Sequence, residues 1–303
     1  MIYAIILNYN NYLDTKECIE SIRRSSQPVN CIVLIDNGSI DGSINELEKE
    51  YELDSKIKII KSKTNLGFAR GVNLGIKQAL TNNAKYILLV NNDAIIDIEC
   101  LNNLCKVCKK NKNIGIVGPR IFYFRDSGRI WQGGGYFSKL KSGVIVPEKN
   151  LLAKQCMTNI EKEVDFLSGC VMLVSRMVFE KIGLFDEDFF FYSEDVDFCL
   201  RAKKAGFKLF YVPSATAWHK ISNINKDRTS PFVLYHLSRS RLIMLHKNFN
   251  FYYFIYGILV HLLVYTPYRL WQVLNGSRQV KAICAWLKGT KDGILWKNNH
   301  TMK

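Results

Sequence analysis

Short apolar runs alternate, within residues 1–120, with segments whose apolar positions recur at helical spacing. Five runs predict strands, at residues 2–7, 31–35, 57–60, 86–90 and 114–117. The intervening segments predict helices, at about residues 13–24, 43–52, 68–80 and 97–110. Strands that alternate with helices form a largely parallel sheet, so the pattern predicts a doubly wound α/β fold that binds ligands at the carboxyl ends of its strands.

The alternation of strands and helices ends after Pro119. A glycine cluster within the polar residues 120–160 predicts loops or a small hairpin there. The apolar run Val164–Val174 predicts one further strand, and residues 194–205 and 207–212 predict a helix and a strand separated by Gly206.

The basic residues are concentrated in the last quarter of the chain. The chain has 303 residues and a net charge of +15, and its 48% hydrophobic content is typical of a folded protein. Residues 1–219 hold 29 Lys and Arg against 25 Asp and Glu, whereas residues 220–303 hold 13 against 2. This shift in composition predicts a domain over residues 1–225 and a basic, aromatic-rich helical extension over residues 226–303.

The extension contains an apolar run, residues 251–267, that includes four tyrosines and His261 and ends at Pro267. A bilayer span needs about 20 apolar residues, so the run lies near the lower limit. Basic residues on both sides favour a helix lying in the membrane interface, with spanning and a buried core helix or dimer contact as alternatives. No nucleic-acid-binding motif accompanies the basic residues, so no nucleic acid partner is expected. Met1–Asn8 lacks the features of a signal peptide, which places the expected location at the cytoplasmic face of the membrane.

Polar residues follow two of the predicted strands. Asp36 ends the second strand, where a carboxylate can accept hydrogen bonds from a nucleotide, although an Asx turn is also compatible. Asp93 follows the fourth strand and could hold a divalent cation through oxygen ligands, or simply cap a helix. Between them, Arg70 in the first turn of a helix could bind phosphate or remain solvated.

The segment from Asp186 to His219 combines adjacent carboxylates with a histidine, which suits a general base beside a metal site. Glu194 and Asp195 fall in the first turn of the predicted helix, where acidic residues also complement the helix dipole. Asp197 lies about 200° around the helix from Asp195, so these two do not share a face. One carboxylate can therefore face the site while another is structural.

These segments together resemble the family 2 glycosyltransferases of the GT-A fold, in particular the rhamnosyltransferase-like and galactofuranosyltransferase-like branch. The matching motifs occur in the family's order. They are Ile5–Asn10, Asp36–Ser39, Asn65–Ala69, Asn91–Asp93, Gly169, Gly183–Phe190, Glu194–Asp197 and Trp218–His219. The resemblance spans about residues 2–222 and implies a GT-A (Rossmann-like) mixed, mostly parallel sheet flanked by helices. The C-terminal helical membrane-associating extension is expected from the composition of the tail, beyond the part that the resemblance covers.

The resemblance also implies roles for individual positions. The nucleotide-sugar would contact Leu7, Asn8, Tyr9, Asp36, Asn65, Arg70, Asn91, Asn92 and Gly169. Asp93 and His219 would hold a divalent cation, Mg²⁺ or Mn²⁺. Asp195 would be the general base, with Glu194 as the second candidate. Asn91 stands where the family has the first acid of its DxD metal motif, which implies weaker metal binding.

The implied activity is that of an inverting glycosyltransferase of cell-surface polysaccharide synthesis. It would move a sugar from a UDP- or dTDP-linked donor to a hydroxyl of a glycan or polyprenyl-linked acceptor. A nucleotidyltransferase is the alternative enzyme, although Leu7–Asn11 lacks the glycine-rich loop with a basic residue typical of that class. The alternative that is not an enzyme is a catalytically degenerate, membrane-attached glycan-binding or scaffold protein.

Overall fold

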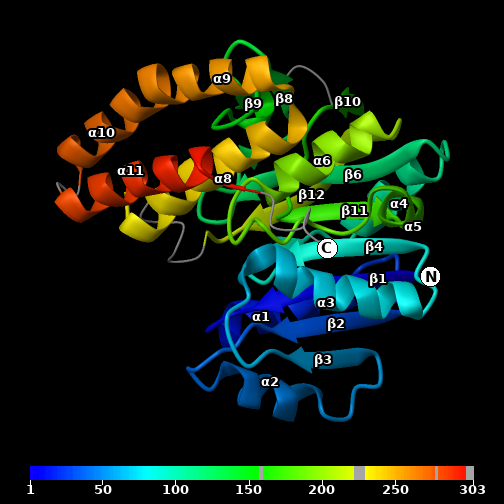
Figure 1. Ribbon diagram of the computed structural model, residues 1–303. Coiled ribbons are helices and arrows are strands. Elements are labelled where there is room, and N and C mark those ends of the chain that lie inside the picture. Colours follow the sequence, from blue (N-terminus) through cyan, green and yellow to red (C-terminus); the bar gives the residue numbers. More distant parts are fainter. Residues whose placement is uncertain (157–159, 222–228, 277–278, 298–303) are drawn as a thin grey trace.

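A computed structural model of the chain describes residues 1–156, 160–221, 229–276 and 279–297. Its centre is a mixed sheet with strand order β10-β12-β6-β11-β4-β1-β2-β3 (Figure 1). The predicted boundary between residues 225 and 226 falls outside the described residues, so the division into two domains stays a prediction.

Four parallel strands form one half of the sheet and confirm the predicted alternation. The strands are β1 (Ile2–Asn8), β2 (Cys31–Asp36), β3 (Ile57–Lys61) and β4 (Tyr86–Asn91). The helices between and after them are α1 (Tyr12–Arg23), α2 (Ser43–Tyr51), α3 (Gly67–Thr81) and α4 (Cys100–Cys108). Successive residues of β1 enter different cores, since Ala4 and Ile6 pack on one face of the sheet and Tyr3 and Ile5 on the other. Burial on both faces explains why these strands are apolar throughout.

The other half of the sheet is mixed. Its long strands are β6 (Ile114–Tyr123) and β12 (Lys208–His219), which pair in parallel and run in the same direction as β1 to β4. Four strands run in the opposite direction. They include β11 (Val171–Ser175), between β4 and β6, and β10 (Lys162–Val164) at the edge. The other two are the short strands β5 (Ala94–Ile96) and β7 (Ile130–Gln132), which pair antiparallel with β12 and β6. The sheet is therefore mixed and mostly parallel, as expected.

The prediction of a single strand over Val164–Val174 is wrong. The chain leaves the sheet after β10 and returns at β11, because the two strands pair with neighbours in different parts of the sheet. Phe166, Leu167 and Cys170 in the connection are nevertheless buried. An apolar run reports burial and does not distinguish a strand from a buried loop, which explains the error.

The hairpin expected within residues 120–160 is present. Strands β8 (Tyr136–Ser138) and β9 (Gly143–Ile145) form a two-stranded sheet, and a 3₁₀ turn, η1 (Ala153–Gln155), follows. Helix α5 (Arg176–Ile182) comes after β11, and α6 (Glu194–Lys204) confirms the predicted helix before β12.

The C-terminal segment is helical. It consists of α8 (Pro231–Asn248), α9 (Phe251–Val260), the π-helical turn η2 (His261–Tyr265), α10 (Thr266–Asn275) and α11 (Val280–Ile294). The helical stretch continues past Pro267, the residue at which the apolar run ends. Pro267 occupies the first turn of α10, where no backbone N–H is required, and the hydroxyl of Thr266 donates to the carbonyl of His261 at 3.0 Å.

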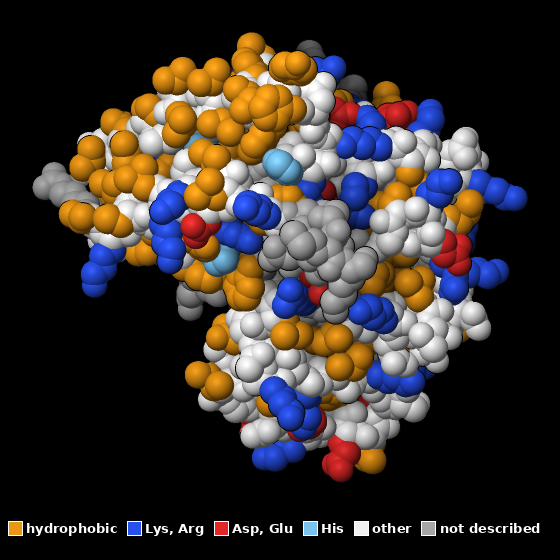
Figure 2. Space-filling model, in the orientation of Figure 1, with side chains coloured by type: hydrophobic (Ala, Val, Ile, Leu, Met, Phe, Trp, Pro, Cys, Tyr) orange, Lys and Arg blue, Asp and Glu red, His pale blue; other side chains and the backbone are white. Residues whose placement is uncertain are grey.

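Helices α9, η2 and α10 form one continuous stretch with an exposed apolar surface. Among the described residues, Phe251–Asn275 is the stretch that is long and apolar enough to cross a membrane, and only 22% of its most apolar part is buried. Figure 2 shows apolar side chains gathered over this stretch, at the top of the molecule.

Candidate active site

Two adjoining cavities lie at the carboxyl ends of the sheet strands. The larger has a volume of about 360 Å³ and the smaller about 150 Å³. Phe68, Asn91 and Phe191 line both cavities. Shared walls of this kind suit two reactants that must meet.

The smaller cavity brings together most of the predicted nucleotide-binding residues with one predicted metal ligand. They are Leu7, Tyr9, Asn65, Asn91, Asn92 and Asp93. Residues after β1 and β4 meet because these parallel strands are neighbours with their carboxyl ends at one edge. At the mouth, Gly67 has a positive φ of 78°, and a Cβ there would lie 2.5 Å from the carbonyl oxygen of Phe190. Only glycine therefore fits between this turn and Phe190.

Three predicted nucleotide-binding residues line neither cavity. Asn8 is fully buried, where its Nδ2 donates to Asp36 Oδ1 at 3.0 Å and its Oδ1 accepts from Thr15 at 2.8 Å. Asp36 also accepts from the Ser39 backbone N–H, so this pair supports the ends of β1 and β2. Arg70 is exposed and lies 3.4 Å from a carboxylate oxygen of Glu187.

Asn37 lines the smaller cavity but was not predicted. Its Nδ2 donates to Asn65 Oδ1 at 3.0 Å, and its Oδ1 accepts from the Leu66 backbone N–H at 2.9 Å. The available signal was its place directly after Asp36 at a strand end. Its amide fixes the turn before α3 against the end of β2.

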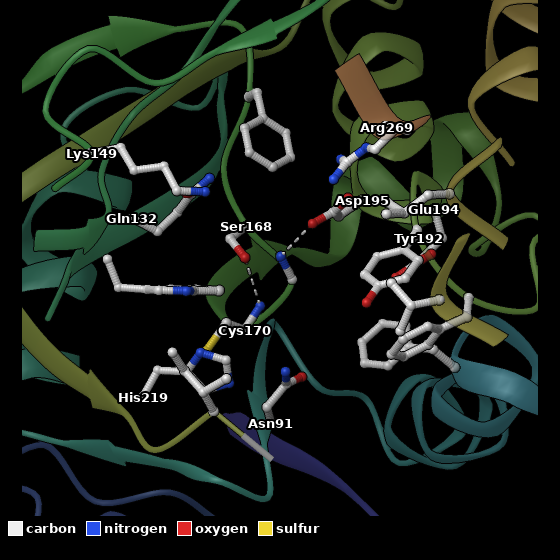
Figure 3. Close-up of a pocket in the computed structure, with 18 residues that line it drawn as sticks. Asn91, Gln132, Lys149, Ser168, Cys170, Tyr192, Glu194, Asp195, His219 and Arg269 are labelled. Atoms are coloured by element: carbon white, nitrogen blue, oxygen red, sulfur yellow. Dashed lines mark hydrogen bonds between the residues drawn. The ribbon is translucent and has the colours of Figure 1, made fainter. Parts of the chain in front are cut away.

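The larger cavity contains both predicted catalytic carboxylates (Figure 3). Oδ2 of Asp195 accepts from the Gly169 backbone N–H at 3.1 Å, and Oδ1 accepts from the Val196 backbone N–H at 2.8 Å. The two residues before α6, Tyr192 and Ser193, both have positive φ values, of 66° and 67°. Such strain in residues other than glycine is often found at functional sites, and here it sets the direction in which α6 begins.

Glu194 and Asp195 titrate differently. Burial, followed by the adjacent Asp195 carboxylate, raises the pKa of Glu194 to about 8. Burial also raises the pKa of Asp195 to about 6, while the hydrogen bonds from Gly169 and Val196 oppose the rise. Oε2 of Glu194 is buried and has no hydrogen-bond partner among the described residues. At neutral pH the pair therefore holds an ionised Asp195 beside a protonated Glu194.

The two predicted metal ligands are in contact between the cavities. His219 Nε2 lies 3.0 Å from Asp93 Oδ1, and both side chains are buried. Pairing of β12 with β5 produces this contact, since His219 is opposite Ala94. Asp93 lines the smaller cavity and His219 the larger, where the Trp131 ring meets the imidazole edge-on with centroids 4.2 Å apart.

This pair fits one side of a divalent-cation site. Adjacent ligands of an octahedral Mg²⁺ lie about 3 Å apart, given metal–oxygen distances of about 2.1 Å. The second ring nitrogen of His219 is buried and has no partner in the described part of the chain. No group of three or more His, Cys, Asp and Glu side chains with metal-binding geometry occurs among the described residues. Two protein ligands suffice when phosphate oxygens of a substrate complete the coordination.

Sequence reasoning missed the rest of the larger cavity. Its walls include Trp131, Gln132 and Lys149 from residues 120–160, and Val233, Leu237 and Arg269 from the C-terminal segment. Arg269 extends from α10 and lies on the same side of the cavity as Asp195 in Figure 3. The segment predicted as a separate extension thus contributes directly to this cavity.

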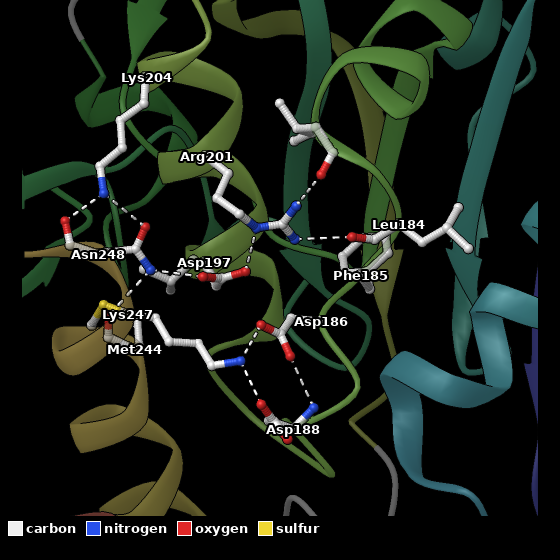
Figure 4. A network of polar contacts seen from close by, with 12 residues as sticks. Leu184, Phe185, Asp186, Asp188, Asp197, Arg201, Lys204, Met244, Lys247 and Asn248 are labelled. Carbon is white, nitrogen blue, oxygen red and sulfur yellow. Dashed lines mark hydrogen bonds and ion pairs between the residues drawn. The ribbon is translucent and has the colours of Figure 1, made fainter. Parts of the chain in front are cut away.

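Helix α8 holds α6 and the loop before it in place (Figure 4). Asp197 is buried and accepts hydrogen bonds from Arg201 Nε and from Asn248 Nδ2, each at 2.7 Å. Lys247 of α8 contacts the carboxylates of Asp186 and Asp188. Asp197 lines neither cavity, which agrees with a structural role, whereas Asp195 two residues earlier faces the larger one.

The chain is similar to known glycosyltransferases. The family model of Glycosyl transferase family 2 matches residues 3–183. The dTDP-rhamnosyl transferase RfbF of Shigella flexneri is 28% identical over 255 residues, covering 82% of this chain and 80% of the relative. The N-acetylglucosaminyl-diphospho-decaprenol L-rhamnosyltransferase of Mycobacterium tuberculosis is 28% identical over 234 residues, covering 71% and 74%.

A solved structure has the same fold at lower sequence identity. The mannosyltransferase PcManGT of Pyrobaculum calidifontis, in complex with GDP-Man and Mn²⁺, superimposes with a TM-score of 0.62 and 12% identity. The match covers 98% of this chain and 88% of PcManGT.

Proposed function

The chain belongs to glycosyl transferase family 2, and we propose that this enzyme transfers a sugar from a nucleoside-diphosphate donor in the smaller cavity to an acceptor hydroxyl in the larger one. The main support for this proposal is the position of Asp195. Its ionised carboxylate lies in the larger cavity, and the Asp93–His219 pair lies between the two cavities. A base and a leaving-group site on adjoining cavities are what direct transfer requires.

The nucleotide of the donor binds in the smaller cavity. Tyr9 and Asn65 supply an aromatic ring and an amide for a base and ribose, while Asn91, which ends β4, and Asn92 would contact the diphosphate. Both rhamnosyltransferase relatives favour an activated rhamnose, and the name of one specifies a dTDP-linked donor. We therefore place dTDP-rhamnose ahead of UDP-linked hexoses as the donor.

Asp93 and His219 would hold Mg²⁺ or Mn²⁺ together with the donor diphosphate. The cation would supply positive charge that stabilises the departing nucleoside diphosphate. PcManGT, which shares the fold, was crystallised with Mn²⁺ and GDP-Man, and this supports a divalent cation here. Asn91 supplies an amide where the family motif has an acid, so fewer carboxylates would face the cation.

Asp195 is the proposed general base. Its carboxylate accepts the proton of the acceptor hydroxyl while the oxygen forms a bond to the anomeric carbon and the bond from that carbon to the diphosphate oxygen breaks. Attack from the face opposite the leaving group inverts the anomeric configuration. Glu194 is protonated at neutral pH and cannot take this proton, which favours Asp195 over its neighbour.

The larger cavity suits an acceptor with both apolar and anionic parts. Trp131, Phe166 and Leu237 supply apolar surface, and Lys149 and Arg269 supply two cations at the same cavity. Guanidinium groups bind phosphate through paired hydrogen bonds. We propose a glycan carried on a lipid diphosphate as the acceptor, by analogy with the diphospho-decaprenol relative, with the enzyme peripheral to the cytoplasmic face of the membrane.

The test is turnover by the purified full-length chain. Donors dTDP-rhamnose and UDP-glucose are offered with Mg²⁺ or Mn²⁺ and a short-chain polyprenyl-diphosphate glycan, and product is followed by chromatography. Transfer that needs Asp195 supports the proposal. Donor binding without turnover across a wide panel would favour a scaffold protein, and pyrophosphate release from a nucleoside triphosphate plus a sugar phosphate would favour a nucleotidyltransferase.

A further inference from the structure

The tip of the β8–β9 hairpin is fixed to helix α9 and turn η2 by tyrosine hydroxyl groups. Tyr253 donates to the carbonyl of Lys139 at 2.7 Å and Tyr256 to that of Leu140 at 2.7 Å. Tyr265 donates to the carbonyl of Lys141 at 3.1 Å. The hydroxyl groups of three tyrosines in the apolar run therefore all donate to backbone carbonyls of the hairpin turn at residues 139–141.

Arg241 of α8 strengthens this attachment. Its guanidinium lies over the Tyr265 ring, 3.8 Å from the centroid, and donates to the Lys141 carbonyl at 3.2 Å. The hairpin tip and the apolar helix are distant in sequence but are joined by these four side chains. Any surface presented by α9 is therefore extended by residues 139–141.

The side chains of the tip match those of the exposed helix surface. Leu140 is 78% exposed and stands between the exposed Lys139 and Lys141. On the helix, Tyr252, Leu259 and Leu263 are 83%, 51% and 73% exposed. Large apolar side chains so exposed and so clustered, as in Figure 2, indicate an interaction surface.

The charge around this surface indicates the partner. Among the described residues 229–297, Asp292 is the single acidic residue, and it accepts a hydrogen bond from Tyr235. Exposed Lys281, Lys288 and Lys291 lie on α11, and exposed Lys139 and Lys141 lie at the hairpin tip. Apolar side chains bordered by lysines, with almost no carboxylates, complement anionic lipid head groups.

We propose that the outer face of α9–α10 and the hairpin tip Lys139–Leu140–Lys141 form one docking face that inserts shallowly into the surface of an anionic bilayer. This inference rests on the peripheral membrane location proposed above and adds a second, non-contiguous segment to it. Leu140 and Leu259 enter the acyl boundary, and the lysines that flank Leu140 contact phosphate groups.

The packing of the helix favours docking over spanning. The buried His261 Nε2 lies 3.2 Å from the Ser238 hydroxyl and 3.1 Å from that of Thr290, and Trp286 stacks on its ring with centroids 4.9 Å apart. A spanning helix would leave the protein body and carry the imidazole and the tyrosine hydroxyls into hydrocarbon without these partners. Docking flat on the surface keeps every one of these contacts.

Docking would place the larger cavity at the bilayer surface. Gln132 and Lys149, which line it, lie on either side of the hairpin in sequence, and Arg269 lines it from α10. The elements that carry the docking face therefore also carry cavity walls. A lipid-linked acceptor could present its head group to Arg269 while its chain remains in the bilayer.

Flotation of the full-length chain with vesicles tests the docking face. Vesicles of phosphatidylcholine with phosphatidylglycerol are compared with phosphatidylcholine alone, using wild type, Leu140→Glu and Leu259→Glu. Leu53→Glu is the matched control, because Leu53 is 97% exposed and distant in sequence from the docking face. We expect binding to the anionic vesicles, weakened about fivefold or more in each docking-face variant and unchanged in the control.

Three outcomes would overturn the inference: no binding by wild type, equal loss in Leu53→Glu, or wild-type binding by Leu140→Glu. Resistance of bound protein to extraction by high salt and carbonate would instead indicate a spanning helix and would also contradict it. Thermal stabilisation by dTDP or UDP is measured in parallel. Loss of vesicle binding with nucleotide binding intact separates this surface from the proposed catalytic function.

Discussion

The backbone N–H of Gly169 donates to Oδ2 of Asp195 at 3.1 Å, so the loop between β10 and β11 orients the proposed base. A carboxylate has about four lone-pair sites, and two backbone donors leave some available for an acceptor hydroxyl. The same hydrogen bond favours the ionised form, which opposes the effect of burial on the pKa. The loop thus contributes both orientation and ionisation.

Substitution Asp195→Asn removes the base and leaves the shape of the cavity intact. We expect kcat/KM to fall by about 10²–10⁴-fold, the usual contribution of a general base. Because burial raises the pKa of Asp195 to about 6, wild-type kcat/KM should fall as the pH decreases through about 6. Rates measured between about pH 5 and 8 test both expectations. Equal activity of wild type and variant would show that Asp195 is not the base.

Glu194→Gln should leave transfer largely intact and change the pH dependence of stability. Burial and Asp195 raise the pKa of Glu194 from 4.5 to about 8. The protonated form therefore stabilises the fold fully below the unfolded value, and this contribution is lost as the pH rises through about 8. Thermal denaturation should show a melting-temperature advantage of Glu194→Gln that grows from pH 5 to pH 8.5. The exposed substitution Glu46→Gln is the control and should show no such growth.

Asn91→Asp should strengthen cation binding at the proposed metal site. Asn91 lines both cavities near Asp93, so a carboxylate there adds negative charge beside the cation. The Mn²⁺ concentration for half-maximal activity should fall, and His219→Ala should raise it. Thermal stabilisation by dTDP with Mn²⁺ gives a readout independent of turnover. Unchanged metal dependence in both variants would remove Asp93 and His219 from the proposed site.

Arg269→Ala should impair acceptor binding selectively. If its guanidinium binds an acceptor phosphate, the KM for a diphosphate-linked acceptor should rise about tenfold or more while the donor KM stays unchanged, and Arg269→Lys should retain part of the affinity. Arg125→Ala, an exposed arginine that lines neither cavity, is the control. A parallel rise of the donor KM would point to a structural role for Arg269.

The half of the site built on parallel strands was predictable from the sequence. Leu7 and Asn91 lie at the ends of neighbouring strands, so their proximity follows from the order of the strands. The proximity of His219 to Asp93 depends on where β12 joins the sheet, and only the resemblance to the family predicted that. Arg269 and Trp131 could not be predicted to share a cavity. They come from segments far apart in the sequence, and only tertiary packing of α10 and β7 brings them together.

The sequence also did not predict which polar residues would be buried. Asn8 and Asp36 occupy strand ends, like Leu7, yet they bind each other and leave the cavity to their neighbours. The alternation of side chains along a strand decides which residue faces the ligand, and the sequence pattern of a strand buried on both faces does not record it. For a similar reason, the apolar run Val164–Val174 did not show that β10 ends at Val164 and β11 begins only at Val171.

Lys247→Met tests whether α8 belongs to the catalytic body. Lys247 contacts Asp186 and Asp188, and its side chain is only 17% exposed, so the substitution leaves two partly buried carboxylates without this cation. We expect a loss of about 1–3 kcal/mol in the free energy of unfolding at neutral pH. Urea denaturation followed by circular dichroism measures it.

Lys281→Met is the control, because Lys281 is an exposed lysine of α11. Comparing the two variants shows whether α8 belongs to the catalytic body or to a separate extension. If α8 were part of a separate extension, both substitutions would change the unfolding free energy equally little and leave kcat unchanged. Because Asn248, the next residue, donates to Asp197 of α6, loosening this end of α8 should also disturb the helix that carries Asp195. Lys247→Met should therefore lower kcat as well as stability, with recovery of both in Lys247→Arg, which restores a cation between the two carboxylates.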